Sequence, residues 1–298
     1  MPGPSVPPTE DRNPRSSGLD LLDTRRILEI MNEEDRSVAA AVAKALDSVA
    51  RAADLAADAL DRGGRLVYLG AGTSGRLAAL DAAEVPPTFG LAPDRVVAVV
   101  AGGDAALRGA VEDAEDDALE AVARMRDLEI GPSDCVVGVT ASGITRFVLG
   151  GLGEARENGA TTVLLTCGVP QERAPWHAVI ALETGPEVVA GSTRLKAGTA
   201  TKMVLNMIST AAMVRLGKVF DNLMVDVRAG NAKLRRRAVR IVETVAGTSE
   251  SRAAEALDRC GGEVRTAIVA LRRGLDPAAA RERLLSRGGR LRAALESP

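Results

Sequence analysis

The chain has 298 residues, of which 46% are hydrophobic and 26% are charged, which is enough for one large α/β domain and a small appendage. Its formal net charge of −2 provides no positive surface for nucleic acid or for an anionic membrane, so neither is expected as a partner. The chain has a single histidine, His177, which argues against a zinc site or a histidine-based catalytic triad.

The remaining composition favours a soluble cytoplasmic protein. The polar, proline-rich residues 1–16 are expected to be disordered at least in part, and they lack the apolar stretch of a signal peptide. No later apolar run reaches the roughly 18 residues that a membrane-spanning helix needs. The three cysteines, Cys135, Cys167 and Cys260, are far apart, and two of them lie in apolar runs. We therefore expect buried, reduced thiols rather than disulfides.

Helical and strand patterns alternate along most of the chain. Thr24 can cap a helix that reaches Met31, and a long helix rich in Ala and Leu is predicted over Asp35–Asp61, ending at two glycines. The predicted strands are Leu66–Leu69, Val96–Val100, Cys135–Thr140, Thr161–Thr166 and Ala178–Leu182. The predicted helices between and after them are Ser74–Glu84, Ala105–Met125, Ile144–Asn158 and Thr199–Leu216.

This alternation predicts an α/β fold in which helices cover both faces of a parallel sheet. Ligands of such sheets bind beyond the carboxyl ends of the strands. We therefore expect the chemistry to lie in the segments after Leu69, Val100, Val139 and Leu182.

The last part of the chain has a different texture, with short helices rich in Arg, Ala and Leu that are separated by glycines. About 60 residues are close to the lower size limit for an independent core. We predict two domains, residues 1–236 and a module of three or four helices at residues 237–298.

The first segment after a strand contains three closely spaced glycines, Gly70, Gly72 and Gly75. A glycine turn between a strand and a helix is an anion site, because free N–H groups and the positive end of the helix dipole point at it. The spacing matches the dinucleotide fingerprint G-x-G-x-x-G, but the acidic residue after the next strand comes later than that fingerprint requires. Thr73 and Ser74 add hydroxyls, so we favour a phosphate monoester, that of a sugar.

A second hydroxyl turn follows the third predicted strand and contains Thr140, Ser142 and Thr145. Hydroxyls at such a turn often only cap the following helix, and for this turn alone that interpretation is slightly preferred. Two hydroxyl turns at the same edge of one sheet instead favour a shared crevice. In the segment after the last strand, Ser192 or Thr193 is expected to cap the last long helix.

Acidic residues accompany these turns. Glu84 lies at the predicted end of the first helix of the sheet, just before Pro86 and Pro87, and we expect a partly buried carboxyl suited to a general acid. Glu112 and Glu115 are expected on one face of a single long helix. From the pattern alone, a solvated helix face is the simpler interpretation of these two glutamates.

Considered together, these residues resemble those of the N-acetylmuramic acid 6-phosphate etherases, a family with a sugar-isomerase (SIS) domain. The resemblance covers nearly the whole chain, and its last part looks like the family's ubiquitin-associated-like helical module. Glucokinase regulatory proteins share several of the strings. The strings are Thr9–Asn13 (TEDRN), Gly70–Arg76 (GAGTSGR), Asp81–Gly90 (DAAEVPPTFG), Ala101–Gly103 (AGG), Ala110–Asp117 (AVEDAEDD), Ala141–Gly143 (ASG), Gly185–Val188 (GPEV), Gly191–Thr199 (GSTRLKAGT) and Gly217–Asp226 (GKVFDNLMVD).

The resemblance implies removal of D-lactate from the C3 oxygen of the sugar without a metal or redox cofactor, and it points to a homodimer. Glu84 corresponds to the family's acid and Glu115 to its second essential carboxylate. Lys196, together with Arg194, is our own candidate for pairing with the lactyl carboxylate. The residues expected to bind the sugar phosphate are Gly72, Thr73, Ser74, Ser142, Gly143, Thr145, Ser192 and Lys196.

Two carboxylates suit this reaction. In the open-chain sugar the C3 ether lies β to the aldehyde, so Glu115 as base removes the C2 proton, Glu84 as acid protonates the departing lactate oxygen, and water adds at C3. Two alternatives stay open. A sugar-phosphate isomerase would use the same proton abstraction without losing a C3 substituent. A catalytically silent sugar-phosphate sensor would need neither glutamate.

Overall fold

The computed structural model describes residues 8–168, 175–226 and 232–296. The chain divides into two compact units, the first comprising residues up to 83 together with 94–211, and the second residues 84–93 together with those from 212 onward. The strands are β1 (Leu66–Gly70), β2 (Val96–Val100), β3 (Cys135–Thr140), β4 (Thr161–Thr166), β5 (Ala178–Ala181), β6 (Val219–Phe220) and β7 (Leu223–Met224). The helices are α1 (Thr24–Lys44), α2 (Leu46–Asp61), α3 (Gly72–Phe89), α4 (Gly103–Arg108), α5 (Ala118–Asp127), α6 (Arg146–Glu157), α7 (Lys196–Arg215), α8 (Ala232–Ala246), α9 (Glu250–Arg259), α10 (Val264–Arg273), α11 (Pro277–Ser286) and α12 (Leu291–Leu295).

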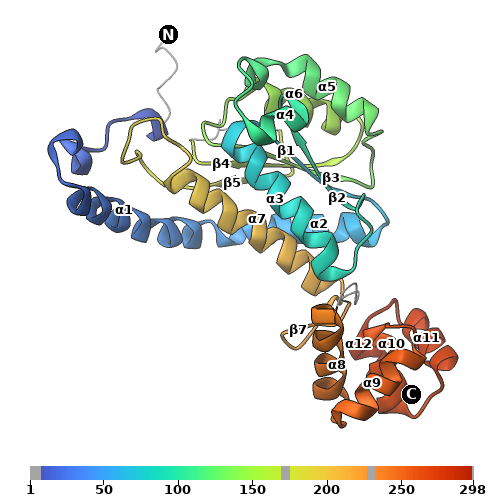
Figure 1. The fold of residues 1–298 in the computed structure, drawn as a ribbon. Coiled ribbons are helices and arrows are strands. Elements are labelled where there is room, and N and C mark those ends of the chain that lie inside the picture. Colours follow the sequence, from blue (N-terminus) through green and yellow to red (C-terminus); the bar gives the residue numbers. More distant parts are fainter. Residues whose placement is uncertain (1–7, 169–174, 227–231, 297–298) are drawn as a thin grey trace. The chain divides into compact units, whose positions relative to one another are not determined.

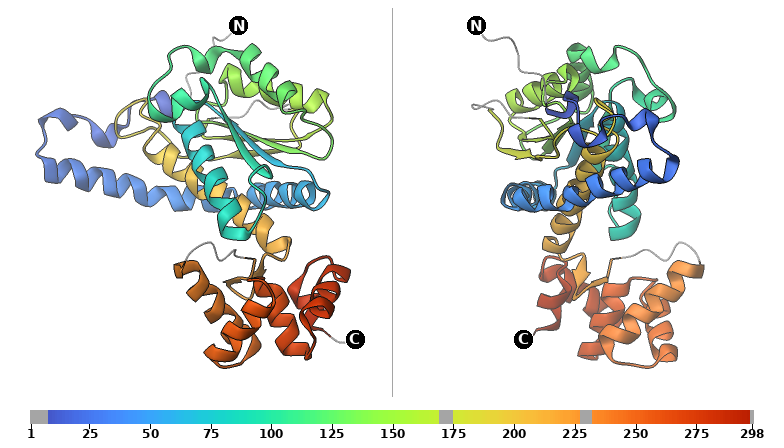
Figure 2. Two further views of the ribbon diagram at one scale, coloured as in Figure 1. Left: turned by 45° about the vertical axis from the view of Figure 1, so that its right-hand side comes forward. Right: turned by 90° about the vertical axis from the view of Figure 1, so that its left-hand side faces the viewer.

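The first unit is built on a five-stranded sheet with the order β2-β1-β3-β4-β5, in which all neighbouring strands are parallel. Helices α5 and α6 cover one face, and α2 and α7 lie on the other (Figure 1), an arrangement that the two turned views in Figure 2 also show. This confirms the predicted α/β fold. The register aligns Gly70 with both Val100 and Val139, and Thr140 with Thr166, so the turns that follow these strands lie along one edge of the sheet.

The core of this unit consists of small and aliphatic side chains, as the low aromatic content requires. Val67, Leu69 and Val136 from the strands pack with Met125 of α5 and Phe147 of α6, all fully buried. Each such side chain contributes about 1.5–3 kcal/mol through burial. The three cysteines are buried and unpaired, as expected, and burial raises the pKa of the Cys135 thiol to about 12.

Two helix boundaries differ from those predicted. The first long helix begins at Thr24 and is interrupted at Ala45, so α1 and α2 replace the predicted helices ending at Met31 and beginning at Asp35. Ala45 has high helix propensity and is buried in the core, so propensity does not account for the interruption. The helix after β1 continues through Pro86 and Pro87 to Phe89, although the two prolines lack the N–H groups that would bond to the carbonyls of Ala82 and Ala83.

Part of the N-terminal segment, which was expected to be disordered at least in part, has a defined structure. Residues 8–16 contain the short 3₁₀ helices η1 (Pro8–Glu10) and η2 (Pro14–Ser16), and Thr9 is fully buried. The carbonyl of Thr9 accepts the N–H of Gly191 at 3.2 Å. Residues 1–7 lie outside the described part of the chain. Contacts with residues that are distant in the sequence hold this segment in place, and such contacts cannot be predicted from its composition.

The second unit contains the antiparallel pair β6-β7 and helices α8 to α12. Its own core is formed by residues including Val242, Leu257, Ile268 and Leu284. The five helices exceed the three or four predicted, and the domain boundary after residue 236 stays a prediction. In the described residues no helix is long and apolar enough to cross a membrane.

Candidate active site

The first hydroxyl turn depends on two glycines that touch each other. A Cβ on Gly75 would lie 2.7 Å from the carbonyl oxygen of Gly70, and a Cβ on Gly70 would lie 2.8 Å from the nitrogen of Gly75. Gly72 begins α3 with φ +52°, a left-handed conformation that glycine adopts without strain. The half-buried Thr73 and Ser74 follow, and within the described residues their hydroxyls form no hydrogen bond, so the start of α3 is open to an anion.

The second hydroxyl turn does not merely cap a helix. Thr145 precedes α6, but its hydroxyl contacts Thr140 Oγ1 at 2.8 Å instead of an N–H of the helix, so α6 begins without a side-chain cap. Ser142 Oγ lies 3.4 Å from Thr140 Oγ1 and accepts the N–H of Ile144 at 3.3 Å. Gly143, at φ +82°, could not carry a Cβ without approaching Thr166 Oγ1 to 3.0 Å. A cluster of hydroxyls thus lies beside uncapped N–H groups.

The third candidate segment, before α7, is occupied by a carboxylate of the chain itself. The helix begins at Lys196 rather than Thr199, and the fully buried Glu187 caps it, accepting the N–H of Lys196 at 3.0 Å and that of Ala197 at 2.9 Å. Capping by Ser192 or Thr193 was therefore a wrong prediction. Burial raises the pKa of Glu187, although the two N–H groups and the charge of Lys196 act against this. Because Glu187 already occupies two of the free N–H groups, this helix start is a poor second site for a phosphate.

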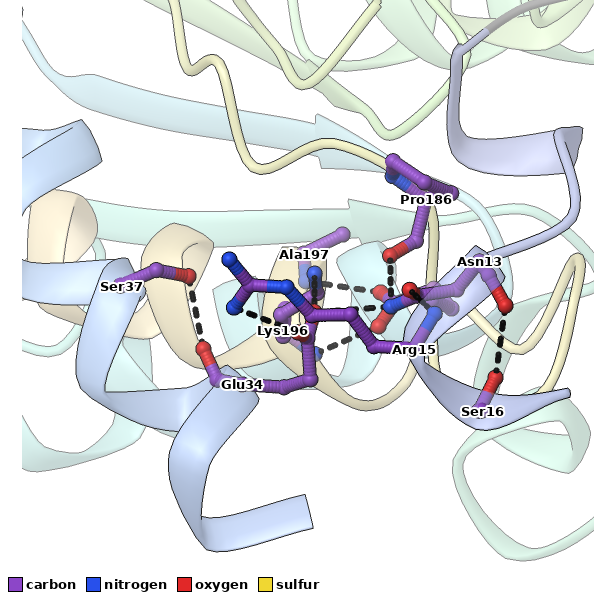
Figure 3. Close-up of polar contacts among 9 residues, drawn as sticks. Asn13, Arg15, Ser16, Glu34, Ser37, Pro186, Lys196 and Ala197 are labelled. Carbon is purple, nitrogen blue, oxygen red and sulfur yellow. Dashed lines mark hydrogen bonds and ion pairs between the residues drawn. The ribbon is translucent and has the colours of Figure 1, made fainter. Parts of the chain in front are cut away.

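Lys196 also has a partner within the chain. Its Nζ lies 2.5 Å from Glu34 Oε2 of α1, and its side chain is 3% exposed. The same glutamate accepts a hydrogen bond from Asn13 Nδ2 at 2.8 Å, and Figure 3 shows these side chains converging. The prediction that Lys196 binds substrate stays a prediction, and this ion pair gives the ammonium a structural role. Arg194 is exposed and has no ion pair among the described residues.

The hydroxyl turns and the start of α7 meet at the carboxyl edge of the sheet. A Cβ on Gly198 in the first turn of α7 would lie 3.6 Å from Thr73 Cγ2. The backbone of Gly168, just beyond β4, lies directly against the carbonyl of Ser142. Next to it, Cys167 Sγ lies 3.8 Å from the carbonyl oxygen of Ala197. These three contacts join residues that are 125, 26 and 30 positions apart in sequence, as expected for the ligand edge of a parallel sheet.

Glu84 is exposed in the last part of α3, not in a partly buried corner at a helix end. Twelve residues, from 72 to 84, separate it from the first residue of that helix. At 1.5 Å per residue this is about 18 Å along the helix. This distance is much longer than the span between the phosphate and C3 of one hexose, so Glu84 and the first hydroxyl turn of the same helix cannot contact one sugar at these two positions.

The segment around Glu115 is not one long helix. It consists of α4, a break in which Asp113 adopts φ 61°, the 3₁₀ helix η4 (Ala114–Asp116) and α5, so Glu112 and Glu115 do not share a helix face as predicted. Both glutamates are exposed. The turn η4, which contains Glu115, packs against α6, the helix that follows the second hydroxyl turn. Arg76 of α3 holds the end of α4, donating to the carbonyls of Ala106 at 2.8 Å and Gly109 at 2.5 Å.

A buried polar network beneath the edge was missed by the sequence reasoning. Asp81 of α3 accepts hydrogen bonds from Tyr68 OH at 2.8 Å, Asn206 Nδ2 at 2.6 Å and Ser209 Oγ at 3.2 Å. Burial, followed by the nearby Asp81 charge, raises the pKa of Tyr68 well above its ordinary value. The network ties α3 to β1 and α7. Its partners are too far apart in sequence to produce a local pattern. Across residues 8–168, 175–226 and 232–296 no group of three or more His, Cys, Asp or Glu residues is arranged to hold a metal ion.

Comparisons with known proteins bear on this site. A family model described as the glucokinase regulatory protein N-terminal SIS domain matches residues 42–156, and one described as the C-terminal lid domain of glucokinase regulatory protein matches residues 221–264. The N-acetylmuramic acid 6-phosphate etherase of Rubrobacter xylanophilus is 53% identical over 293 residues, covering 96% of this chain and 95% of its own length. N-acetylmuramic acid 6-phosphate etherase 1 of Bacillus licheniformis is 50% identical over 284 residues, covering 94% and 92%.

Among solved structures, a putative phosphosugar isomerase involved in capsule formation from Bacteroides fragilis has a TM-score of 0.50. It is 20% identical and covers 66% of this chain and 94% of its own. At this identity the similarity concerns the fold alone.

Proposed function

The chain belongs to the N-acetylmuramic acid 6-phosphate etherase family, and from this membership we propose that it is a carbon–oxygen lyase that cleaves the D-lactyl ether of N-acetylmuramic acid 6-phosphate. The products are N-acetylglucosamine 6-phosphate and D-lactate. The observation that carries the proposal is identity of 50% or more over nearly the full length of both proteins. Two open hydroxyl turns at one edge of the sheet support a substrate with a single phosphate.

We propose that the 6-phosphate binds between the starts of α3 and α6. In its support, the hydroxyls of Thr73 and Ser74 form no hydrogen bond with any residue that the structure describes. The hydroxyls of Ser142 and Thr145 lie beside the first turn of α6, which has no side-chain cap. Two helix N-termini each offer free N–H groups and a partial positive charge to the dianion. The start of α7 lacks this capacity because the carboxyl group of Glu187 already accepts the N–H groups of Lys196 and Ala197.

The chemistry proceeds by elimination and addition. Glu115 takes the C2 proton of the open-chain aldehyde, the C3–O bond breaks, and Glu84 gives its proton to the lactate oxygen that leaves. Water then adds to the unsaturated aldehyde at C3, and a proton returns to C2. The exposed Arg194, next to Thr193 at this edge, is a better candidate for the lactyl carboxylate than the paired Lys196.

We propose that Glu84 acts on the sugar bound by a second copy of the chain in a cytoplasmic homodimer. This follows from the distance of about 18 Å along α3, which separates Glu84 from the phosphate turn of its own chain. An apolar groove of about 680 Å³ between α2 and α7, lined by residues including Leu46, Val49, Met207 and Ala211, offers a surface for that second copy.

The direct test is incubation with N-acetylmuramic acid 6-phosphate, with separate assays for D-lactate and for ketose. We expect D-lactate and N-acetylglucosamine 6-phosphate in equal amounts, and no ketose. In ¹⁸O-labelled water the new C3 hydroxyl should carry the label, because the added oxygen comes from solvent. Label in lactate would mean cleavage on the lactyl side. Ketose without lactate would identify an isomerase, and binding without any turnover would identify a sensor.

A further inference from the structure

The start of α7 is held by a buried group of side chains that the proposed reaction does not use. Glu34 of α1 accepts Lys196 Nζ at 2.5 Å and Asn13 Nδ2 at 2.8 Å through Oε2, and Arg15 reaches its Oε1 at 3.3 Å. Asn13 also donates to the carbonyl of Pro186 at 3.3 Å. Figure 3 shows that these residues come from the N-terminal segment, from α1 and from the segment leading into α7.

The central pair of this group is shielded from water. The side chains of Lys196 and Glu34 are 3% and 8% exposed, whereas Arg15 is 75% exposed and adds little. Burial acts to raise the pKa of Glu34, but the hydrogen bonds from Lys196 and Asn13 outweigh it and the pKa is lowered. A buried ion pair often contributes little net stability compared with apolar side chains of the same size. The ion pair instead fixes the positions of the Lys196 ammonium and the Glu34 carboxylate relative to each other.

That position is linked to the phosphate turn through the first turn of α7. Lys196 is the first residue of the helix, and its backbone N–H is fixed by Glu187 while its side chain is fixed by Glu34. Two residues later, Gly198 faces the methyl group of Thr73 so closely that an added Cβ would be in van der Waals contact with it, 3.6 Å from Thr73 Cγ2. A shift of the first turn of α7 would therefore displace backbone that borders Thr73 in the first hydroxyl turn.

We propose that Glu34 is a positioning residue for the phosphate-binding turn, acting through its ion pair with Lys196 at the start of α7. The assignment rests on the proposed function in that the ligand is a sugar 6-phosphate held at Thr73 and Ser74. Glu34 contacts neither the reacting atoms nor the proposed acid and base. Its loss should therefore weaken binding of the phosphate while leaving the chemical step nearly intact.

The test compares Glu34→Gln with a matched control at an exposed ion pair that joins the same two regions. Lys44 of α1 pairs with Glu183 after β5 at 3.0 Å, and both side chains are largely exposed, so Glu183→Gln removes a comparable charge without disturbing α7. Calorimetric binding of N-acetylglucosamine 6-phosphate and the kinetics of lactate release are measured for each variant.

For Glu34→Gln we expect the Kd for the sugar phosphate and the KM to rise together by about 10- to 100-fold, because small displacements of binding groups have effects of this size. We expect kcat to change less than about threefold. Glu34→Asp keeps the carboxylate on a shorter side chain and should recover part of the affinity. Glu183→Gln should match the parent in all three quantities.

A second variant keeps the test decisive if Glu34→Gln alone does not fold. Glu34→Gln with Lys196→Met leaves neither member of the buried Glu34–Lys196 pair without its partner, and Glu187 keeps its two backbone N–H partners. The double variant should therefore fold with a circular dichroism spectrum like that of the parent, yet it should still bind the sugar phosphate weakly. Parental Kd in either folded variant overturns the proposal, as does a fall in kcat with KM unchanged. A parent protein that binds the sugar phosphate but releases no lactate would instead refute the proposed function, and the binding comparison would still decide the role of Glu34.

Discussion

At the residue scale, Glu84 and Glu115 are exposed carboxylates on different backbones, a continuous α-helix and a single 3₁₀ turn. Glu84→Ala should slow lactate release by about 10²- to 10⁴-fold but still exchange the C2 proton with D2O, because proton abstraction does not need the acid. Glu115→Ala should lose both activities. Mass spectrometry of the sugar and an assay of lactate measure the two steps.

Glu112→Ala, which removes a neighbouring exposed carboxylate, is the control and should behave like the parent. The opposite pattern of exchange would reverse the two roles.

At the element scale, α7 depends on a cap that lies nine residues before its first residue, Lys196. The cap is Glu187, whose pKa is raised, mainly by burial, from an ordinary value of 4.5. A carboxyl with a raised pKa in the folded state contributes stability that is fully present below its unfolded pKa and is lost as the pH rises through its folded pKa. The Tm of the parent relative to Glu187→Gln should therefore fall as the pH rises from about 4, and then become constant. Thermal unfolding between about pH 4 and pH 8 measures this difference in Tm.

Glu183→Gln, an exposed change in the same segment, should show a difference in Tm from the parent that does not change with pH. A constant difference for Glu187→Gln would contradict the assignment.

At the scale of the whole molecule, the position of Glu84 on α3 predicts an active site shared between two copies. Glu84→Ala and Glu115→Ala are each nearly inactive, but mixing them by unfolding and refolding should restore about a quarter of the parental lactate release, because half of the dimers are mixed and each contains one intact site. If each chain used its own two glutamates, mixed dimers would contain no intact site and activity would stay at the level of the separate variants. Each variant refolded alone is the control, and light scattering verifies that dimers form in every sample.

Local patterns in the sequence determined the strands, the parallel sheet and the two hydroxyl turns. The apolar runs that became β1 and β3 mark buried strands, and the glycines at positions 70 and 75 permit the close contact between β1 and α3. These features depend on residues that are neighbours in the chain, so periodicity and turn chemistry are sufficient to predict them. The same holds for the family resemblance, which rests on contiguous strings.

Only the tertiary structure decided which polar groups are already paired. Glu34 and Lys196 are 162 residues apart, so no local pattern predicts that the lysine expected at the substrate is held by a buried carboxylate. The break between α1 and α2 falls at the buried Ala45, a residue whose helix propensity would favour continuing the helix. Glu84 and the phosphate turn share one short stretch of sequence, but the rigid rise of the α-helix separates them by about 18 Å. Residues that are close in sequence can thus lie far apart along a helix. Contacts between residues that are distant in sequence form only when the chain folds.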